Sequence, residues 1–107
     1  MNPTRVRREA VRRLTDLPNV GPATAADLEL LGIATPQDLA KADPLALYQA
    51  LCRRTGARQD PCVLDVFLSI TDFARGAPAR AWWDYTDERK RRYGLRPWDT
   101  DDGSEAP

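Results

Sequence analysis

Apolar residues recur at the spacing of an α-helix along most of the chain, and proline or glycine bounds nearly every such stretch. The first stretch covers residues 5–16 and runs into a tight turn. The second covers residues 22–31, and Gly32 follows it as a C-terminal cap. Inward positions of these two predicted amphipathic helices are Val6, Ala10, Leu14, Leu17, Ala25, Leu28 and Leu31.

Three later helices share one start signal, an Asp or Thr directly before a proline. They are predicted over residues 36–41, 44–55 and 61–75, and Gly56 and Gly76 end the last two. Their inward residues are Leu47, Tyr48, Leu51, Cys52, Val63, Val66, Phe67, Ile70 and Phe73.

A sixth helix is predicted over residues 79–92. Trp82 and Trp83 are neighbours in it, so the two rings cannot point the same way. The favoured interpretation buries both rings against the bundle, and the alternative leaves one exposed to stack on a base or a protein partner. Residues 94–107 are polar and acidic, which predicts a mostly disordered tail after a single domain of residues 1–93.

The turn between the first two helices reads Leu17-Pro18-Asn19-Val20-Gly21-Pro22-Ala23-Thr24-Ala25. It resembles the helix-hairpin-helix motif, whose turn commonly reads apolar-Pro-Gly-Val-Gly-Pro-Lys-Thr-Ala. Asn19 stands where that motif has its first glycine, and Ala23 stands where it has lysine. Asparagine tolerates the left-handed backbone region, so we expect the turn to persist. The missing lysine predicts weaker binding to phosphate.

The start of the second helix is a candidate phosphate site. Its first amides have no partner within the helix, and the helix dipole adds partial positive charge there. The residues expected to form this site are Asn19, Val20, Gly21, Ala23 and Thr24. The alternative is a turn between two helices that binds nothing.

The formal net charge is zero, so the total charge does not indicate a nucleic-acid partner. The positions of the cationic residues along the chain are more informative. All but Lys41 and Lys90 of the 16 cations are arginine, which suits phosphate recognition. Arg5, Arg8 and Arg12 would share one face of the first helix and lead into the turn. This face is interpreted either as a basic nucleic-acid contact or as an ordinary solvated surface.

Enzyme chemistry is not expected. The chain has no histidine, so the usual Ser/His and Cys/His nucleophile pairs are excluded. With 107 residues, it is also too short for the second domain that encloses a flipped base in DNA glycosylases. No signal peptide and no membrane span is visible, which predicts a cytoplasmic protein. No cofactor is expected.

Cys52 and Cys62 lie on either side of the predicted turn at residues 56–61. They would come near each other if the flanking helices run antiparallel, so they are a candidate redox pair. The alternative is two reduced thiols that act as small apolar residues. A metal site is not expected, because two more ligands would be needed.

The order of these elements is typical of a tandem helix-hairpin-helix domain, an all-α fold of five helices, here with a degenerate second hairpin and an extra C-terminal helix. From Leu14 to about Arg92 the chain also resembles the Cdd1 or "pathogenicity locus" family, and it is similar to the C-terminal domain of TfoX-type competence regulators. The resemblance rests on Leu17–Pro22, Leu31-Gly32-Ile33, Asp43-Pro44, residues 60–67 and Trp82-Trp83. It implies binding of DNA. Because Ala23 replaces the usual lysine and phosphate contacts act on any sequence, this binding is expected to be weak and independent of sequence. The alternative is a protein–protein interaction module that kept the fold and lost the ligand.

Overall fold

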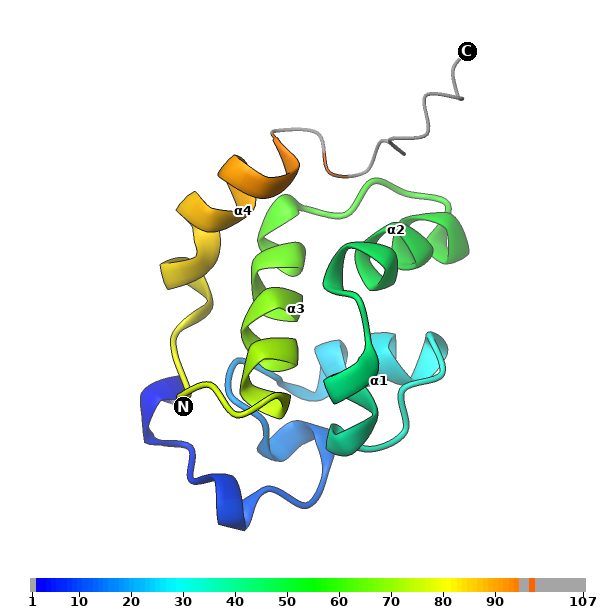
Figure 1. Ribbon diagram of the computed structural model, residues 1–107. Helices are drawn as coiled ribbons and strands as arrows, with labels where there is room; N and C mark the ends of the chain where they lie inside the picture. Colours follow the sequence, from blue (N-terminus) through cyan, green and yellow to red (C-terminus); the bar gives the residue numbers. More distant parts are fainter. Residues whose placement is uncertain (1, 95–96, 98–107) are drawn as a thin grey trace.

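Helix α3 (Pro61–Ala74) is the central element of the structure. The computed structural model describes residues 2–94 and residue 97. Over these residues the fold is all-α, without a β-strand, as the sequence predicts. Figure 1 shows α3 in the middle, with α2 and α4 on either side of it. Its side chains are buried on several faces, including Leu64, Leu68 and Phe67, so the helix is enclosed rather than amphipathic.

The helices α1 (Pro22–Leu30) and α2 (Pro44–Thr55) and the short 3-10 helix η4 (Pro36–Lys41) confirm the predicted elements. Each begins with a proline at its first position, where a missing N–H is tolerated. Gly32 follows α1 at φ 89°, and the Ile33 amide donates to the Leu28 carbonyl at 2.9 Å, which closes the helix as predicted.

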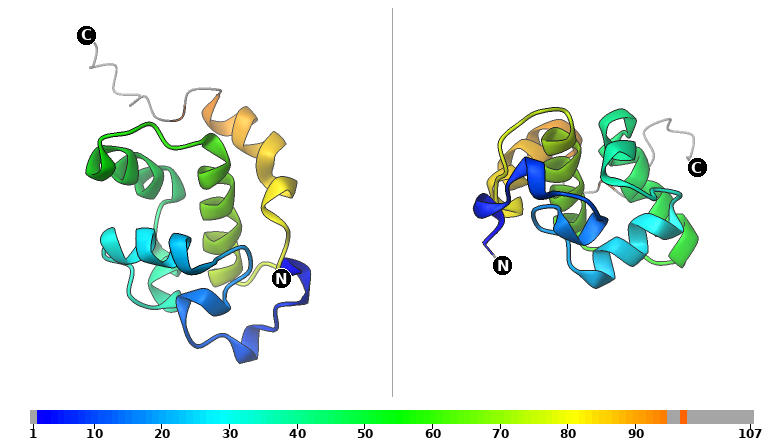
Figure 2. Two further views of the ribbon diagram at one scale, coloured as in Figure 1. Left: turned by 180° about the vertical axis from the view of Figure 1, so that it is seen from behind. Right: turned by 90° about the horizontal axis from the view of Figure 1, so that it is seen from below.

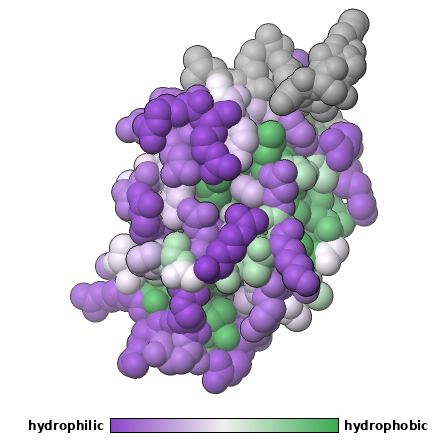
Figure 3. Space-filling view, viewed as in Figure 1, coloured by the Kyte–Doolittle hydropathy of each residue, from purple (hydrophilic) through white to green (hydrophobic). Residues whose placement is uncertain are grey.

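A buried ion pair joins α4 (Thr86–Tyr93) to α3. Asp65 is fully buried, and its carboxylate accepts hydrogen bonds from Arg89 Nε at 2.8 Å and from the Thr86 hydroxyl at 2.8 Å. The rest of α4 is rich in charged residues, and Figure 3 shows hydrophilic surface over it. This pair therefore gives a polar helix a specific attachment to an apolar one.

The predicted first helix over residues 5–16 is wrong. The segment forms three separate 3-10 turns instead, η1 (Pro3–Arg5), η2 (Arg8–Ala10) and η3 (Leu14–Asp16). Extended residues separate them, including Val6 and Val11. Ala10, predicted to face inward, is exposed.

Long-range contacts explain why this segment does not form one helix. The Arg8 guanidinium donates to the carbonyl of Phe73 in the last turn of α3 and to the carbonyl of Ala77 beyond the end of the helix. It also lies 4.0 Å from the centroid of the Phe73 ring. The Asp16 carboxylate accepts from the backbone amides of Arg12 and Arg13, each at 2.9 Å. The long-range bonds of Arg8 draw the chain around the end of α3, as Figure 2 shows from two further sides, and the local bonds of Asp16 close η3.

The predicted C-terminal helix is confirmed only in part. Residues 79–81 are not helical, and the segment begins with the 3-10 turn η5 (Trp82–Tyr85), which leads directly into α4. The predicted disordered tail lies almost entirely outside the described residues. No described helix has both the length and the apolar character that a membrane crossing requires.

The Asp65–Arg89 pair generates a stability prediction. Arg89→Met would leave the buried carboxylate without its cation, a change expected to lower the free energy of unfolding by about 3–5 kcal/mol. Urea denaturation followed by circular dichroism measures this loss.

Arg91→Met is the matched control, because it removes the same charge from an exposed position of the same helix. We expect a change within about 0.5 kcal/mol for this variant. Equal effects of the two substitutions would contradict a special role for the buried pair.

Candidate functional site

The turn between η3 and α1 is built around two buried anchors and one left-handed residue. Leu17 and Val20 are each only 1% exposed, so both ends of the turn are fixed in the core. Asn19 between them has φ 67°, the left-handed conformation that was predicted for this position. Gly21 is extended, at φ −99° and ψ −174°, and precedes α1 as its N-cap.

The Asn19 side chain ties this turn to two distant parts of the chain. Its amide nitrogen donates to the Ser69 hydroxyl of α3 at 3.0 Å and to the Arg80 carbonyl at 2.8 Å. Its carbonyl oxygen accepts from the Trp82 backbone amide at 3.2 Å. A glycine at this position would make none of these bonds. Asn19 therefore keeps the turn conformation and adds a cross-link.

The start of α1 differs from the starts of α2 and α3. Asp43 and Asp60 cap those two helices, and their carboxylates accept from amides in the first turn at 3.0 and 2.9 Å. Gly21 has no side chain with which to do this.

Three amides at the start of α1 consequently stay open. The amides of Gly21, Ala23 and Thr24 have no hydrogen-bond acceptor within the described part of the chain. The fourth amide expected in the site, that of Val20, donates to the Leu17 carbonyl at 3.4 Å. Gly21 and Ala23 are exposed and Thr24 is partly exposed, so this end of α1 lies at the surface.

A hollow of about 290 Å³ adjoins this turn. Its lining residues are Pro3, Asn19, Val20, Gly21, Trp82 and Trp83. Trp83 is 59% exposed, so the interpretation that buries both indoles is wrong for this one. The two rings meet edge to face, with centroids 5.5 Å apart. The Trp pair and the turn, separated by about 60 residues in sequence, thus form one surface.

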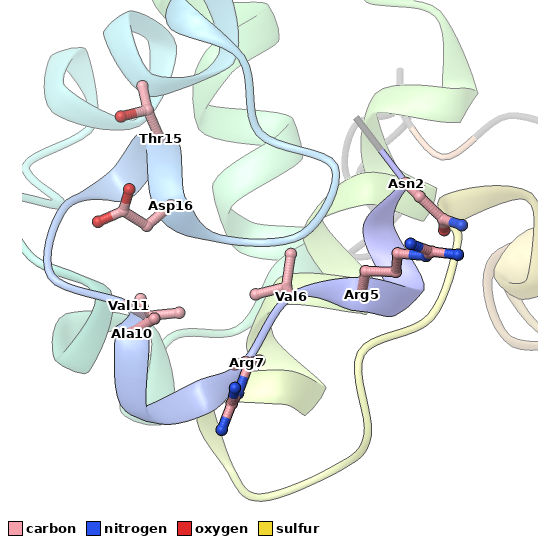
Figure 4. A pocket seen from close by; sticks show the side chains of 8 residues that line it. All are labelled: Asn2, Arg5, Val6, Arg7, Ala10, Val11, Thr15 and Asp16. Atoms are coloured by element: carbon pink, nitrogen blue, oxygen red, sulfur yellow. The ribbon is translucent and has the colours of Figure 1, made fainter.

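The three arginines of the predicted basic face do not share one helix face, because the segment forms separate 3-10 turns. Arg8 is bonded to the end of α3, and Arg12 donates to the Glu9 carbonyl at 2.6 Å. Arg5 makes no ion pair with a described residue, and it belongs to the same 3-10 turn as Pro3. Figure 4 shows Arg5 beside Asn2 at one edge of a second hollow, of about 320 Å³, while Arg7 points away in another direction.

The second turn, at residues 56–61, does not repeat the first. Gly56 is left-handed, at φ 69°, and ends α2. The Asp60 carboxylate occupies the amide end of α3, and its bond to the Cys62 amide lowers the pKa of Asp60. An ionised carboxylate at this position disfavours an anionic ligand. That this turn is a degenerate copy of the first hairpin stays a prediction.

Cys52 and Cys62 are free thiols, and each is partly buried. The Cys52 sulfur accepts from the Gln59 amide at 3.4 Å. Burial, with the Asp60 carboxylate adding to it, raises the pKa of Cys62 to about 11. A thiol with such a pKa is mostly protonated near neutral pH, which slows its oxidation. Their pairing under oxidising conditions remains a prediction.

Sequence reasoning missed two parts of this site, Ser69 and Pro3. Ser69 lies on a helix face that reads as core, and Pro3 precedes the first predicted helix at residues 5–16. One feature of the sequence could have indicated a partner such as Ser69, namely that Asn19 replaces the glycine of the hairpin motif. A side chain that replaces glycine in a tight turn has polar groups that need partners.

Comparison with known proteins places the chain in a family. The Cdd1 family, described as "Pathogenicity locus", matches residues 7–91, and the chain belongs to it. A relative from Streptomyces lavendulae, the "Mitomycin resistance protein McrB", is 47% identical over 78 residues, which are 73% of this chain and 74% of that protein. No solved structure matches the chain.

The raised pKa of Cys62 predicts slow alkylation. At pH 8 only about one thiol in a thousand would be ionised, and the rate should increase roughly tenfold per pH unit until the pH approaches 11. Iodoacetamide labelling, followed at the level of the Cys62 peptide by mass spectrometry, measures this rate.

Asp60→Asn is the informative variant, since asparagine still caps the helix but carries no charge. Because the Asp60 carboxylate contributes to the raised pKa, this variant should label faster than the parent at pH 8. Labelling of the parent at the rate of a free cysteine would contradict the assignment.

Proposed function

We propose that this protein binds nucleic acid without sequence preference, as a non-enzymatic protein, and that the open amides at the start of α1 hold a backbone phosphate. The proposal interprets the turn as a helix-hairpin-helix type of hairpin. The observation that supports it best is the absence of a carboxylate cap on α1, where α2 and α3 each have one.

The geometry of the turn supports this function through preorganisation. Leu17 and Val20 anchor the backbone of the turn in the core, and the Asn19 side chain fixes it further through three hydrogen bonds. The donors therefore need little ordering when an anion arrives, which favours binding. The positive end of the helix dipole adds to the attraction.

The cations near the site are fewer than the sequence suggested. The guanidinium groups of Arg8 and Arg12 donate to backbone carbonyls, so we do not expect them to bind phosphate. Arg5 remains as a candidate second contact, because it shares a turn with Pro3 at the edge of the hollow. With a formal net charge of zero, the protein should bind weakly.

A protein–protein interaction module is the second candidate. The exposed indole of Trp83 favours it, because aromatic side chains are common anchors at such interfaces. The two candidates differ in their dependence on salt. Binding through phosphate weakens steeply as salt increases, and an aromatic anchor in a protein interface is much less sensitive.

The name of the Streptomyces relative suggests a cellular test of the proposal. If this chain shares that role, loss of the protein should make its host more sensitive to mitomycin, and the wild-type chain should restore resistance. A variant that folds but binds no nucleic acid should fail to restore it. Full restoration of mitomycin resistance by that variant would show that resistance does not depend on nucleic-acid binding.

Gly21→Asp tests the open amides directly. The side chain meets no atom within 4 Å and the backbone is extended, so the substitution fits the fold. Its carboxylate would cap α1 as Asp43 and Asp60 cap their helices, which should leave stability unchanged or slightly higher. DNA binding, measured by fluorescence anisotropy at low salt, should fall by at least tenfold.

Gly21→Asn is the control of matched shape, since it also caps the helix but brings no negative charge. It should weaken binding less than Gly21→Asp does, because only the aspartate repels the phosphate. Unchanged binding by a folded Gly21→Asp variant would exclude the start of α1 as the phosphate site.

Ala23→Lys restores the cation that the hairpin motif usually carries. Ala23 is exposed beside the open amides, so a lysine there could reach a phosphate without disturbing the core. The variant should bind DNA more tightly, and the slope of log K against log salt should steepen by about 0.9 for duplex. A lysine at exposed Ala46 of α2 is the control for added net charge, and it should change the slope little.

A further inference from the structure

We propose that the hollow beside the turn receives one unpaired base of a single-stranded nucleic acid, stacked on Trp83. This inference rests on the proposed function, because the phosphate of the bound strand would lie on the amides of α1. It adds a preference that the amides cannot supply, namely single strands over duplex.

The first argument is the exposure of an aromatic ring in a built hollow. Trp83 is 59% exposed, although large aromatic rings gain most from burial. Trp82 braces it edge to face, at a centroid distance of 5.5 Å, so the two indoles do not stack on each other. Trp83 thus remains available for a flat partner.

The second argument is that the hollow and the amides are one rigid unit. Gly21 lines the hollow and also contributes one of the open donors. Asn19 accepts from the Trp82 amide at 3.2 Å and donates to the Arg80 carbonyl at 2.8 Å, which holds the Trp segment against the turn. A ligand that offers an aromatic ring next to an anion would satisfy both parts, and a nucleotide within a strand is such a ligand.

The third argument concerns which form of nucleic acid can enter. In a duplex the faces of the bases are covered by their neighbours, so a surface indole has no base face to meet. Single strands expose those faces, and stacking on aromatic side chains is tolerant of sequence.

The Asp84 carboxylate follows Trp83 in sequence and would repel a phosphate. It lies 3.9 Å from the Arg80 guanidinium, so its negative charge is partly balanced.

The test compares Trp83→Ala, Trp83→Phe and the parent on a thymidine oligonucleotide and on a duplex of equal length. Loss of one stacked base should weaken single-strand binding by roughly 5- to 150-fold, with little change for duplex. Trp83→Phe keeps an aromatic face and should recover most of the affinity. Thermal denaturation verifies that both variants fold.

Tryptophan fluorescence gives a second measurement. In a Trp98→Phe background, emission comes from Trp82 and Trp83 alone, and the oligonucleotide should quench it. Quenching by free thymidine at the same concentration as by the oligonucleotide would show that the hollow binds small aromatic molecules, and it would overturn the assignment to a strand.

The variants at the turn separate the two proposals. Loss of binding to both forms with Gly21→Asp, together with no effect of Trp83→Ala, would overturn the base site and leave the phosphate site standing. A large effect of Trp83→Ala on single strands with no effect of Gly21→Asp would support stacking and reject the phosphate site. Equal losses on duplex and single strand with Trp83→Ala would also overturn the preference.

Discussion

The burial of α3 is the constraint on which the rest of the structure depends. A helix enclosed by other elements must find a partner for each polar group that it carries, since an unpaired polar group in the core is costly. The Asp65 carboxylate accepts hydrogen bonds from Arg89 and Thr86, and the Ser69 hydroxyl accepts one from Asn19. The C-terminal end of the helix offers the Phe73 carbonyl, which accepts from Arg8. Asp65, Ser69 and Phe73 thus attach three different segments, namely α4, the turn before α1 and η2. The polar groups of the central helix therefore direct how these parts of the chain pack.

The candidate site is a consequence of one of these attachments. Asn19 satisfies Ser69, and the same side chain reaches the backbone at Arg80 and Trp82. The turn before α1 and the aromatic pair are therefore positioned by a single residue. This explains how a departure from the usual glycine can be tolerated, because the left-handed backbone is retained and its side chain is used. The proposed phosphate site and the proposed base site therefore depend on the same residue.

The three α-helices α1, α2 and α3 differ in whether the amides at their starts are capped by a side chain. Aspartates close the amide ends of α2 and α3 from within the chain, whereas glycine leaves that of α1 open to solvent. Two of the three arginines that looked like a basic face, Arg8 and Arg12, donate instead to backbone carbonyls of the chain itself. A protein with balanced charge can still offer one local site for an anion, because the helix dipole and open amides act at short range. Weak and general binding is the expected result of such a site.

The sequence by itself determined the features that depend on neighbouring residues. Proline after aspartate or threonine located the starts of η4, α2 and α3, and glycine located the ends of α2 and α3. Asn19 was predicted in the conformation it has. These are local effects of backbone geometry and capping. The path of residues 5–16 and the exposure of Trp83 were decided only by the tertiary structure. Arg8 bonds to carbonyls 65 and 69 residues away, and the Trp82 amide bonds to Asn19, 63 residues away. Helical periodicity in a short segment is a small preference, and long-range hydrogen bonds of this kind outweigh it.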